Sequence, residues 1–287
     1  MATNSTHLRS AVGSTAPWNV VEAGGVSLAY NDEGRGPSLV CLHAIGHGAG
    51  DFVHFRRAFA ADYRVIAVDW PGQGNSGADD LPASDRRYAE LLGLFLDRLG
   101  IEKTVLIGNS IGGATALRYA ADRPDRVRAL VLENPGGLDP GGRLARAIVG
   151  GMAAFFRAGE RRARWFPALF RRYYSRVLSE PPAAEQRDRI VAAGYEIAPV
   201  LARAWESFGQ PESNLRGKIP SVRCPVLFAW AVKDRFVRLD RNRPAINQFP
   251  DVQLVEFRAG HAVHLEAPEQ FEAVVRDFLR KSVPSLG

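Results

Sequence analysis

The sequence of 287 residues is poor in sulfur, with two cysteines and two methionines. Cys41 and Cys224 lack CxxC spacing, and each lies beside or within an apolar, strand-like run. This pattern indicates two buried thiols rather than a disulfide framework. No apolar run approaches the length of a membrane span, and neither an internal repeat nor a low-complexity tract is present. These absences argue against a membrane-spanning protein and a repeat protein.

The bulk composition is that of a globular protein with a large core. Because 46% of the residues are hydrophobic, one domain with an insertion fits the chain better than two independent domains. Residues 1–18 are polar and lack the apolar core of a signal peptide. We therefore expect a flexible N-terminal extension on a cytoplasmic protein, with a homo-oligomer left open.

The net charge of +6 is concentrated in one part of the chain. Residues 141–216 contain 13 Lys and Arg against 7 Asp and Glu, whereas the remainder has 24 of each. The arginines stand among aromatic residues, a composition that could serve nucleic acid, but the sequence contains no nucleic-acid-binding module. We interpret this charge as the solvated face of a helical lid, and we expect neither a nucleic-acid nor a membrane partner.

Strand-like and helix-like segments alternate along most of the chain. Strands are predicted near residues 26–30, 38–43, 64–68, 104–109, 129–133, 226–230 and 253–257, with a further one near 19–22. Helices are predicted over residues 52–60, 84–99, 110–121, 239–248 and 269–281. This alternation predicts an α/β fold whose mostly parallel sheet is covered by helices on both faces.

The alternation stops after the strand near residues 129–133. From about residue 140 onward the segments are helix-like and rich in Ala, Arg and aromatic residues. We predict a helical cap over residues 140–217, called the cap segment below, inserted into a core of residues 19–139 and 218–287. Such a cap would wall off a site at the strand ends, exclude water and set the shape of the substrate.

The stretch GNSIG at residues 108–112 is the most informative motif. It follows an apolar run and opens a helix of small residues, so G-x-S-x-G stands at a strand–turn–helix junction, as in a nucleophile elbow. A serine on such a sharp turn is reached by both a base and a substrate, and the flanking glycines permit close backbone approach. We predict that Ser110 is a nucleophile and that the Ile111 amide donates to a developing oxyanion.

Two polar residues downstream complete the expected order of Ser, acid and His for this kind of site. Asp234 follows the strand near residues 226–230, and His261 follows the strand near 253–257. Both therefore lie just past the carboxyl ends of strands, at the edge where Ser110 is exposed. We predict that His261 accepts the Ser110 proton and that Asp234 orients the imidazole and stabilises its charged form.

Together these motifs resemble the α/β-hydrolase superfamily of esterases, C–C hydrolases and dehalogenases, over nearly the whole chain. The matching pieces are LH at residues 42–43, DWPGQGNS at 69–76, the elbow, DRFV at 234–237 and GHAVHLEAP at 260–268. The resemblance implies an α/β-hydrolase fold of the serine-nucleophile branch. No cofactor is expected.

The resemblance also places a second oxyanion donor in the loop of residues 43–50. The amide of Ile45 is the candidate, although relatives usually carry His-Gly where this chain has His-Ala. His43 and His47 lie in the same loop, but no third ligand is spaced nearby, so no metal site is expected. We expect His43 to fix the loop by hydrogen bonding.

Two residues compete with the predicted pair of base and acid. His264 is a rival to His261, but its place just before the last helix favours a structural role. Glu133 is a rival to Asp234, because some relatives place the acid after that strand. Asp234 is preferred since it lies in KDRF, which matches the commoner pattern.

The serine nucleophile favours attack on an acyl carbon over dehalogenation or epoxide opening, for which relatives use Asp at this position. Hydrolysis of a small carboxylic ester is our leading expectation. The alternative is C–C hydrolysis of vinylogous diketone acids, because residues 108–117, 134–138 and 234–237 are similar to the meta-cleavage-product hydrolases. Against it stand the missing Gly-Pro of the oxyanion loop and Ala262 in place of Trp after the histidine. A third hypothesis is a ligand-binding protein on the same fold that is non-catalytic or turns its ligand over slowly.

Overall fold

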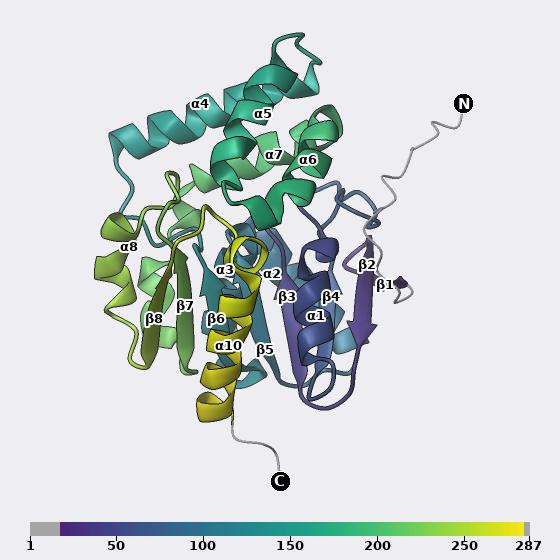
Figure 1. The fold of residues 1–287 in the computed structure, drawn as a ribbon, viewed down its shortest axis with the longest axis vertical. Helices are drawn as coiled ribbons and strands as arrows, with labels where there is room; N and C mark the ends of the chain where they lie inside the picture. Colours follow the sequence, from purple (N-terminus) through teal and green to yellow (C-terminus); the bar gives the residue numbers. More distant parts are fainter. Residues whose placement is uncertain (1–17, 284–287) are drawn as a thin grey trace.

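The computed structural model describes residues 18–283, which form one eight-stranded sheet with helices around it (Figure 1). The strand order is β1-β2-β4-β3-β5-β6-β7-β8. β2 pairs antiparallel with β1 and β4, and every other pair is parallel. The strands are β1 Asn19–Ala23, β2 Val26–Glu33, β3 Ser38–Leu42, β4 Arg64–Val68, β5 Thr104–Asn109, β6 Val127–Glu133, β7 Val226–Ala231 and β8 Val252–Phe257.

Helices cover both faces of the sheet because the central strands present apolar side chains to both. In β3, for example, Leu39 and Cys41 pack in one core cluster and Val40 and Leu42 in the other. The first cluster also holds side chains of α1 and α10, and the second holds those of α2, α3 and α8. Their bounds are α1 Val53–Phe59, α2 Asp85–Arg98, α3 Ile111–Asp122, α8 Leu239–Ile246 and α10 Pro268–Ser282.

The cap segment contains four α-helices and no strand among its residues. They are α4 Arg143–Glu160, α5 Phe166–Val177, α6 Ala184–Ala192 and α7 Gly194–Phe208. Figure 1 shows them grouped over one end of the sheet. Fully buried aromatic rings, Phe156, Phe166 and Phe170, form the interior of this group, which explains the aromatic residues between the arginines. The division of the chain into core and cap stays a prediction.

The predicted fold class is confirmed, and each strand or helix of the core predicted from the sequence is present within a few residues of its expected ends. A short helix, α9 Val263–Glu266, was not predicted. Of the expected N-terminal extension, residues 1–17 lie outside the described residues. Both cysteines are free and buried, as expected. Across residues 18–283, no helix combines the length and apolar character that crossing a bilayer requires.

Gly112 fixes how closely α3 approaches the sheet. A Cβ at this position would overlap the Leu42 carbonyl oxygen and lie 2.9 Å from the His43 carbonyl oxygen. Since both neighbours are backbone atoms at the end of β3, neither can move aside cheaply.

We predict that Gly112→Ala lowers the free energy of unfolding by at least about 2 kcal/mol, because the added methyl group forces α3 away from β3. The matched control is Gly150→Ala in α4, where a Cβ would meet nothing within 4 Å. That variant should be unchanged or up to about 1 kcal/mol more stable, since Ala favours a helix over Gly. Urea unfolding measures both, and equal stability of the two variants would contradict the proposed packing constraint.

Candidate active site

Ser110 lies on a strained turn between β5 and α3. Its backbone angles are φ 56° and ψ −115°, a conformation that residues other than glycine rarely adopt. The Ser110 amide donates to the Glu133 carbonyl oxygen (3.0 Å), and the Ser110 carbonyl accepts from Ala114 N (2.9 Å). These backbone bonds hold the turn from both sides, so the strand–turn–helix geometry expected of the elbow is present.

His261 and Asp234 form a direct pair. Nδ1 of His261 donates to Oδ2 of Asp234 at 2.6 Å, and the two side chains are 11% and 1% exposed. The Nε2 atom is thereby left to accept a proton. Among the described residues, no hydrogen bond joins the Ser110 hydroxyl to His261. The two residues nevertheless lie on adjoining segments, because Asn109 Nδ2 donates to the His261 carbonyl oxygen at 2.9 Å.

Asp234 is held in a cradle of hydrogen bonds. The amides of Phe236 and Val237 donate to Oδ1 at 2.8 and 3.1 Å, and Asn134 Nδ2 donates to Oδ2 at 2.9 Å. Asn134 in turn accepts from the Ala231 amide at 2.7 Å, which fixes it to the end of β7. The carboxylate is therefore oriented before any substrate binds. Asn134 was not singled out from the sequence, although its place directly after β6 and its φ of 39° mark it.

The pKa of His261 reflects two opposing effects. Burial disfavours the charged imidazolium and lowers the pKa, but the charge and hydrogen bond of Asp234 outweigh it. The net effect is a pKa raised above the ordinary 6.5. The pair thus stabilises a proton on His261, which is what a base needs after it has taken one.

Glu133, the rival acid, pairs with the rival base instead. Its Oε2 accepts from His264 Nδ1 at 2.9 Å and from the His264 amide at 3.0 Å, and both side chains are buried. The His264 ring stacks on Phe52 with centroids 4.3 Å apart. The structure therefore contains two separate carboxylate–histidine pairs, and the contacts of Glu133 fit the structural role predicted for His264.

Glu266 connects the His261 loop to the cap segment. Its Oε2 accepts from the His261 amide at 2.8 Å, while its Oε1 accepts from the amides of Ser179 and Glu180 at 2.7 and 3.0 Å. One buried carboxylate thus fixes the backbone of His261 and the chain just beyond α5. This role was not found from the sequence, where Glu266 appeared as part of a matching motif.

The loop after β3 is closed by a tight turn. His47 N donates to the Ala44 carbonyl (3.2 Å), and Gly46, third in this turn, has the positive φ of 79° that a type II turn requires. The Gly46 amide donates to Gln73 Oε1 at 2.6 Å, which clamps the loop from outside. Neither Ile45 N nor Ile111 N donates to another described residue, and the packing of Gly112 on Leu42 brings their two segments together.

His43 has the loop-fixing hydrogen bonds that its position predicted. Its Nδ1 donates to the Ala44 carbonyl (2.7 Å) and its Nε2 accepts from Trp70 N (3.0 Å). Burial lowers its pKa to about 4, so it is neutral at pH 7. His47 instead pairs with Asp51 at 2.6 Å. Within residues 18–283, no three His, Cys, Asp or Glu side chains come together as a metal site would need.

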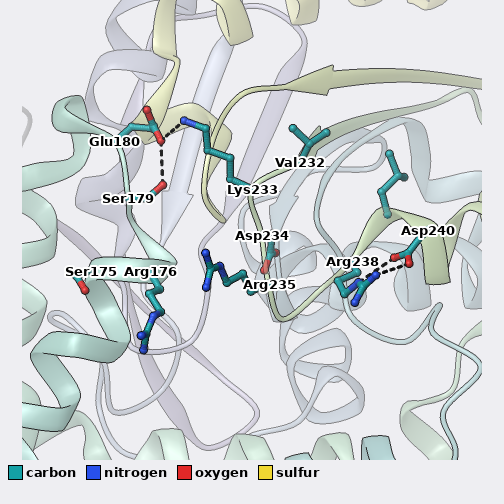
Figure 2. A pocket seen from close by; sticks show the side chains of 11 residues that line it. Ser175, Arg176, Ser179, Glu180, Val232, Lys233, Asp234, Arg235, Arg238 and Asp240 are labelled. Atoms are coloured by element: carbon teal, nitrogen blue, oxygen red, sulfur yellow. Dashed lines mark hydrogen bonds and ion pairs between the residues drawn. The ribbon is translucent and has the colours of Figure 1, made fainter.

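The arginines of the cap segment have varied surroundings. Arg162 lies over the Tyr195 ring at 5.2 Å and Arg189 reaches Asp51 at 3.5 Å. Arg176 faces an open cleft beside Asp234, shown in Figure 2. Most of the others are exposed, as the interpretation of a solvated face predicted.

The chain belongs to the Alpha/beta hydrolase family, whose sequence profile it matches over residues 39–274. It is 31% identical to a 2-hydroxy-6-oxononadienedioate/2-hydroxy-6-oxononatrienedioate hydrolase of Burkholderia vietnamiensis, over 92% of this chain and 94% of that protein. It is 28% identical to a 2-hydroxy-6-oxo-6-phenylhexa-2,4-dienoate hydrolase of Comamonas testosteroni, over 88% and 91%. A crystal structure of a membrane phospholipase A has the same fold, with a TM-score of 0.81 at 24% identity over 94% of this chain and 87% of that one.

These similarities bear directly on the expected reaction. The chain is a hydrolase of the predicted superfamily, and the two relatives described above are named as dienoate hydrolases. They therefore favour the C–C hydrolase alternative over ester hydrolysis, which was the leading expectation from the sequence.

Because the structure contains two carboxylate–histidine pairs, substitution of each carboxylate in turn tests which acid supports the proposed base. Asp234→Asn should lower kcat/KM by roughly a thousandfold or more, because the amide no longer stabilises the imidazolium and favours the wrong tautomer. Glu133→Gln should retain activity within about tenfold, since its remaining oxygen can still accept from His264. Steady-state kinetics on both purified variants measures the two effects. The reverse ranking would assign the role of the acid to Glu133 at the end of β6.

Proposed function

We propose that this protein is a serine hydrolase in which Ser110, His261 and Asp234 form a catalytic triad. The observation that carries the proposal is the pairing of His261 with a pre-oriented Asp234 next to a serine on a strained turn. The amides of Ile45 and Ile111 are the proposed oxyanion donors, since neither donates a hydrogen bond to another described residue and the two lie on segments in contact.

Each proposed step conserves atoms and charge. Ser110 Oγ forms a bond to the substrate's carbonyl carbon while its proton passes to His261 Nε2, and the carbonyl oxygen becomes an oxyanion facing the two amides. The bond to the leaving group then breaks, and that group takes the proton from His261. Water attacks the resulting acyl-serine by the same route, which releases the acid and restores Ser110.

For the leaving group we propose a carbon, as in hydrolysis of a vinylogous 1,5-diketone acid. Similarity to dienoate hydrolases over about nine-tenths of both chains supports this choice. The step requires the diketone tautomer of such a substrate, which forms from the 2-hydroxy-dienoate when the 2-hydroxyl loses a proton and the carbon next to the attacked carbonyl gains one. In that tautomer the electron pair of the broken C–C bond passes into the conjugated enone, so the leaving carbanion is stabilised without a cofactor. The protein then needs to supply the nucleophile, the oxyanion donors and the proton, which are the roles proposed here for Ser110, the amides of Ile45 and Ile111, and His261.

Ester hydrolysis is the second candidate, and particular residues favour it. Ala262 follows the histidine where the C–C hydrolases tend to carry Trp, and the loop of residues 43–50 lacks their Gly-Pro ending. The same triad would expel an alkoxide instead of a carbanion.

The proposal predicts that the purified protein hydrolyses a 2-hydroxy-6-oxo-dienoate faster than it hydrolyses p-nitrophenyl esters, judged by kcat/KM. Ser110→Ala and His261→Ala should each lower kcat by at least about a thousandfold, and combining them should add little because the two groups act as a unit. Loss of the dienoate's absorbance and release of p-nitrophenolate report the two reactions. A preference for the esters would favour ester hydrolysis, the second candidate. Near-normal turnover by folded Ser110→Ala would contradict the assignment of Ser110 as the nucleophile.

The raised pKa of His261 predicts how activity depends on pH. The base must be neutral to accept the serine proton, so kcat/KM should fall as the pH drops through a pKa above 6.5. In Asp234→Asn, burial acts without the opposing charge, so the acidic limb of the residual activity should move to lower pH. The profile is measured with a substrate that does not titrate in this range. An acidic limb at the same or a higher pH in the variant would contradict the proposed effect of Asp234 on the pKa of His261.

A further inference from the structure

The first two helices of the cap segment carry a large excess of positive charge. Residues 143–177, from the start of α4 to the end of α5, contain nine arginines and a single acidic residue. Their net charge of +8 exceeds the +6 of the whole chain. Arg157 and Arg162 pair with carboxylates elsewhere in the cap segment, whereas the guanidinium groups of Arg172 and Arg176 form no ion pair with another described residue. The potential around these two helices is therefore positive.

Large apolar side chains are exposed among these arginines. Leu144 and Ile148 belong to α4, Trp165 precedes α5 and Leu169 lies within it, and each of the four is between 48% and 70% exposed. Single exposed apolar residues are ordinary on a protein surface, but a group of them is typical of a site that contacts another molecule or a membrane.

Helical spacing aligns these side chains into two edges that meet. Positions 144, 148 and 155 follow one another at intervals of four and seven residues, so they share one edge of α4. Positions 165, 169, 172 and 176 follow at intervals of four, three and four residues, so they share one edge along α5. The rings of Phe155 and Trp165 are 6.1 Å apart, which joins the two edges. The residues of both edges, called the cap face below, are Leu144, Ile148, Phe155, Trp165, Leu169, Arg172 and Arg176.

The cap face lies at an outer end of the molecule. Figure 1 shows the turn between α4 and α5, to which Trp165 belongs, near the top of the view and away from the sheet. Tryptophan and arginine both suit the boundary between water and lipid. An indole ring packs among lipid headgroups, and a guanidinium group binds phosphate while its aliphatic stem lies against apolar groups.

We propose that the cap face docks the protein on a membrane surface that contains anionic lipid. The apolar side chains enter the headgroup boundary, and the arginines bind the lipid phosphates. From the sequence we expected no membrane partner and a solvated charged face. The sequence does not show which apolar residues stay exposed beside the arginines, and this exposure is the observation that changes the interpretation.

A second copy of this chain is a poorer occupant of the cap face. A two-fold contact through this face would set Arg172 and Arg176 of one copy against the same arginines of the other. With one acidic residue in residues 143–177, little negative charge is available there to offset that repulsion. An anionic lipid surface supplies the missing counter-charge.

Sedimentation of the full-length protein with sucrose-loaded vesicles tests the proposal. The probes are vesicles of phosphatidylcholine alone and vesicles in which about 30% of the lipid is phosphatidylglycerol. The variants are Trp165→Ser, Leu169→Ser and Arg172→Gln, compared with the unsubstituted protein. The matched controls are Leu94→Ser and Arg98→Gln on α2 of the core, where both side chains are also exposed.

We expect the unsubstituted protein to bind the anionic vesicles at least about tenfold more tightly than vesicles of phosphatidylcholine. Trp165→Ser and Leu169→Ser should each weaken this binding by about fivefold or more, because each removes apolar area from the lipid. Arg172→Gln should weaken it by about threefold or more at about 50 mM salt, and by less at about 500 mM salt, where charges are screened. The two α2 variants should bind as the unsubstituted protein does.

Absence of binding to the anionic vesicles, equal binding to both kinds of vesicle, or an equal loss in the α2 variants would overturn the proposal. Sedimentation velocity without vesicles supplies a further test, since a dimer that dissociates in Trp165→Ser would assign the cap face to a second copy instead. Vesicle binding requires no turnover, so its failure is distinct from failure of the proposed triad, which would appear as activity in Ser110→Ala. Thermal unfolding of each variant confirms that it is folded, as expected for substitutions of exposed side chains.

Discussion

The strained backbone at Ser110 is the constraint around which the rest of the site is arranged. A residue other than glycine at φ 56° costs on the order of 1–3 kcal/mol and persists when its surroundings over-determine it. Here the Glu133 carbonyl holds the Ser110 amide, and α3 packs so closely that a Cβ at Gly112 would overlap the backbone of β3. The tight packing of β3, β5 and α3 therefore holds the partly exposed Ser110 in its strained conformation.

Two buried glutamates extend this rigidity to the histidine. Glu133 bonds the elbow through its carbonyl and the start of α9 through its carboxylate, so one residue spans the nucleophile and the loop of the base. Glu266 bonds the His261 amide on one oxygen and the chain after α5 on the other. The position of His261 consequently depends on both the sheet and the cap segment. Three of the four carboxylate oxygens accept hydrogen bonds that replace those of lost waters, whereas Glu133 Oε1 has no partner among the described residues.

Most of the fold could be predicted from the sequence because strands with two buried faces read as apolar runs and the helices between them as periodic ones. Chain order and strand ends also predict that Ser110, Asp234 and His261 lie at one edge of the sheet, whereas their catalytic roles stay a prediction. The contacts of Asn134, Glu266 and Gln73 could not be predicted from the sequence. Each depends on a distant amide or carboxylate that only tertiary packing brings close. The motifs also could not decide between ester and C–C cleavage, because the same triad can perform both. The leaving group that is accepted depends on the shape of the pocket around the triad.

The aromatic contact across the junction of cap and core gives the molecule an optical property. Phe236, two residues after Asp234, lies 5.1 Å from the ring of Tyr173 and 6.4 Å from that of Trp205, both from the cap segment. Indole emission responds to the packing and wetting of its ring. Trp205 is one of five tryptophans and lies at the boundary between the cap segment and the core, so its share of the emission responds to changes in packing at that boundary without an attached dye.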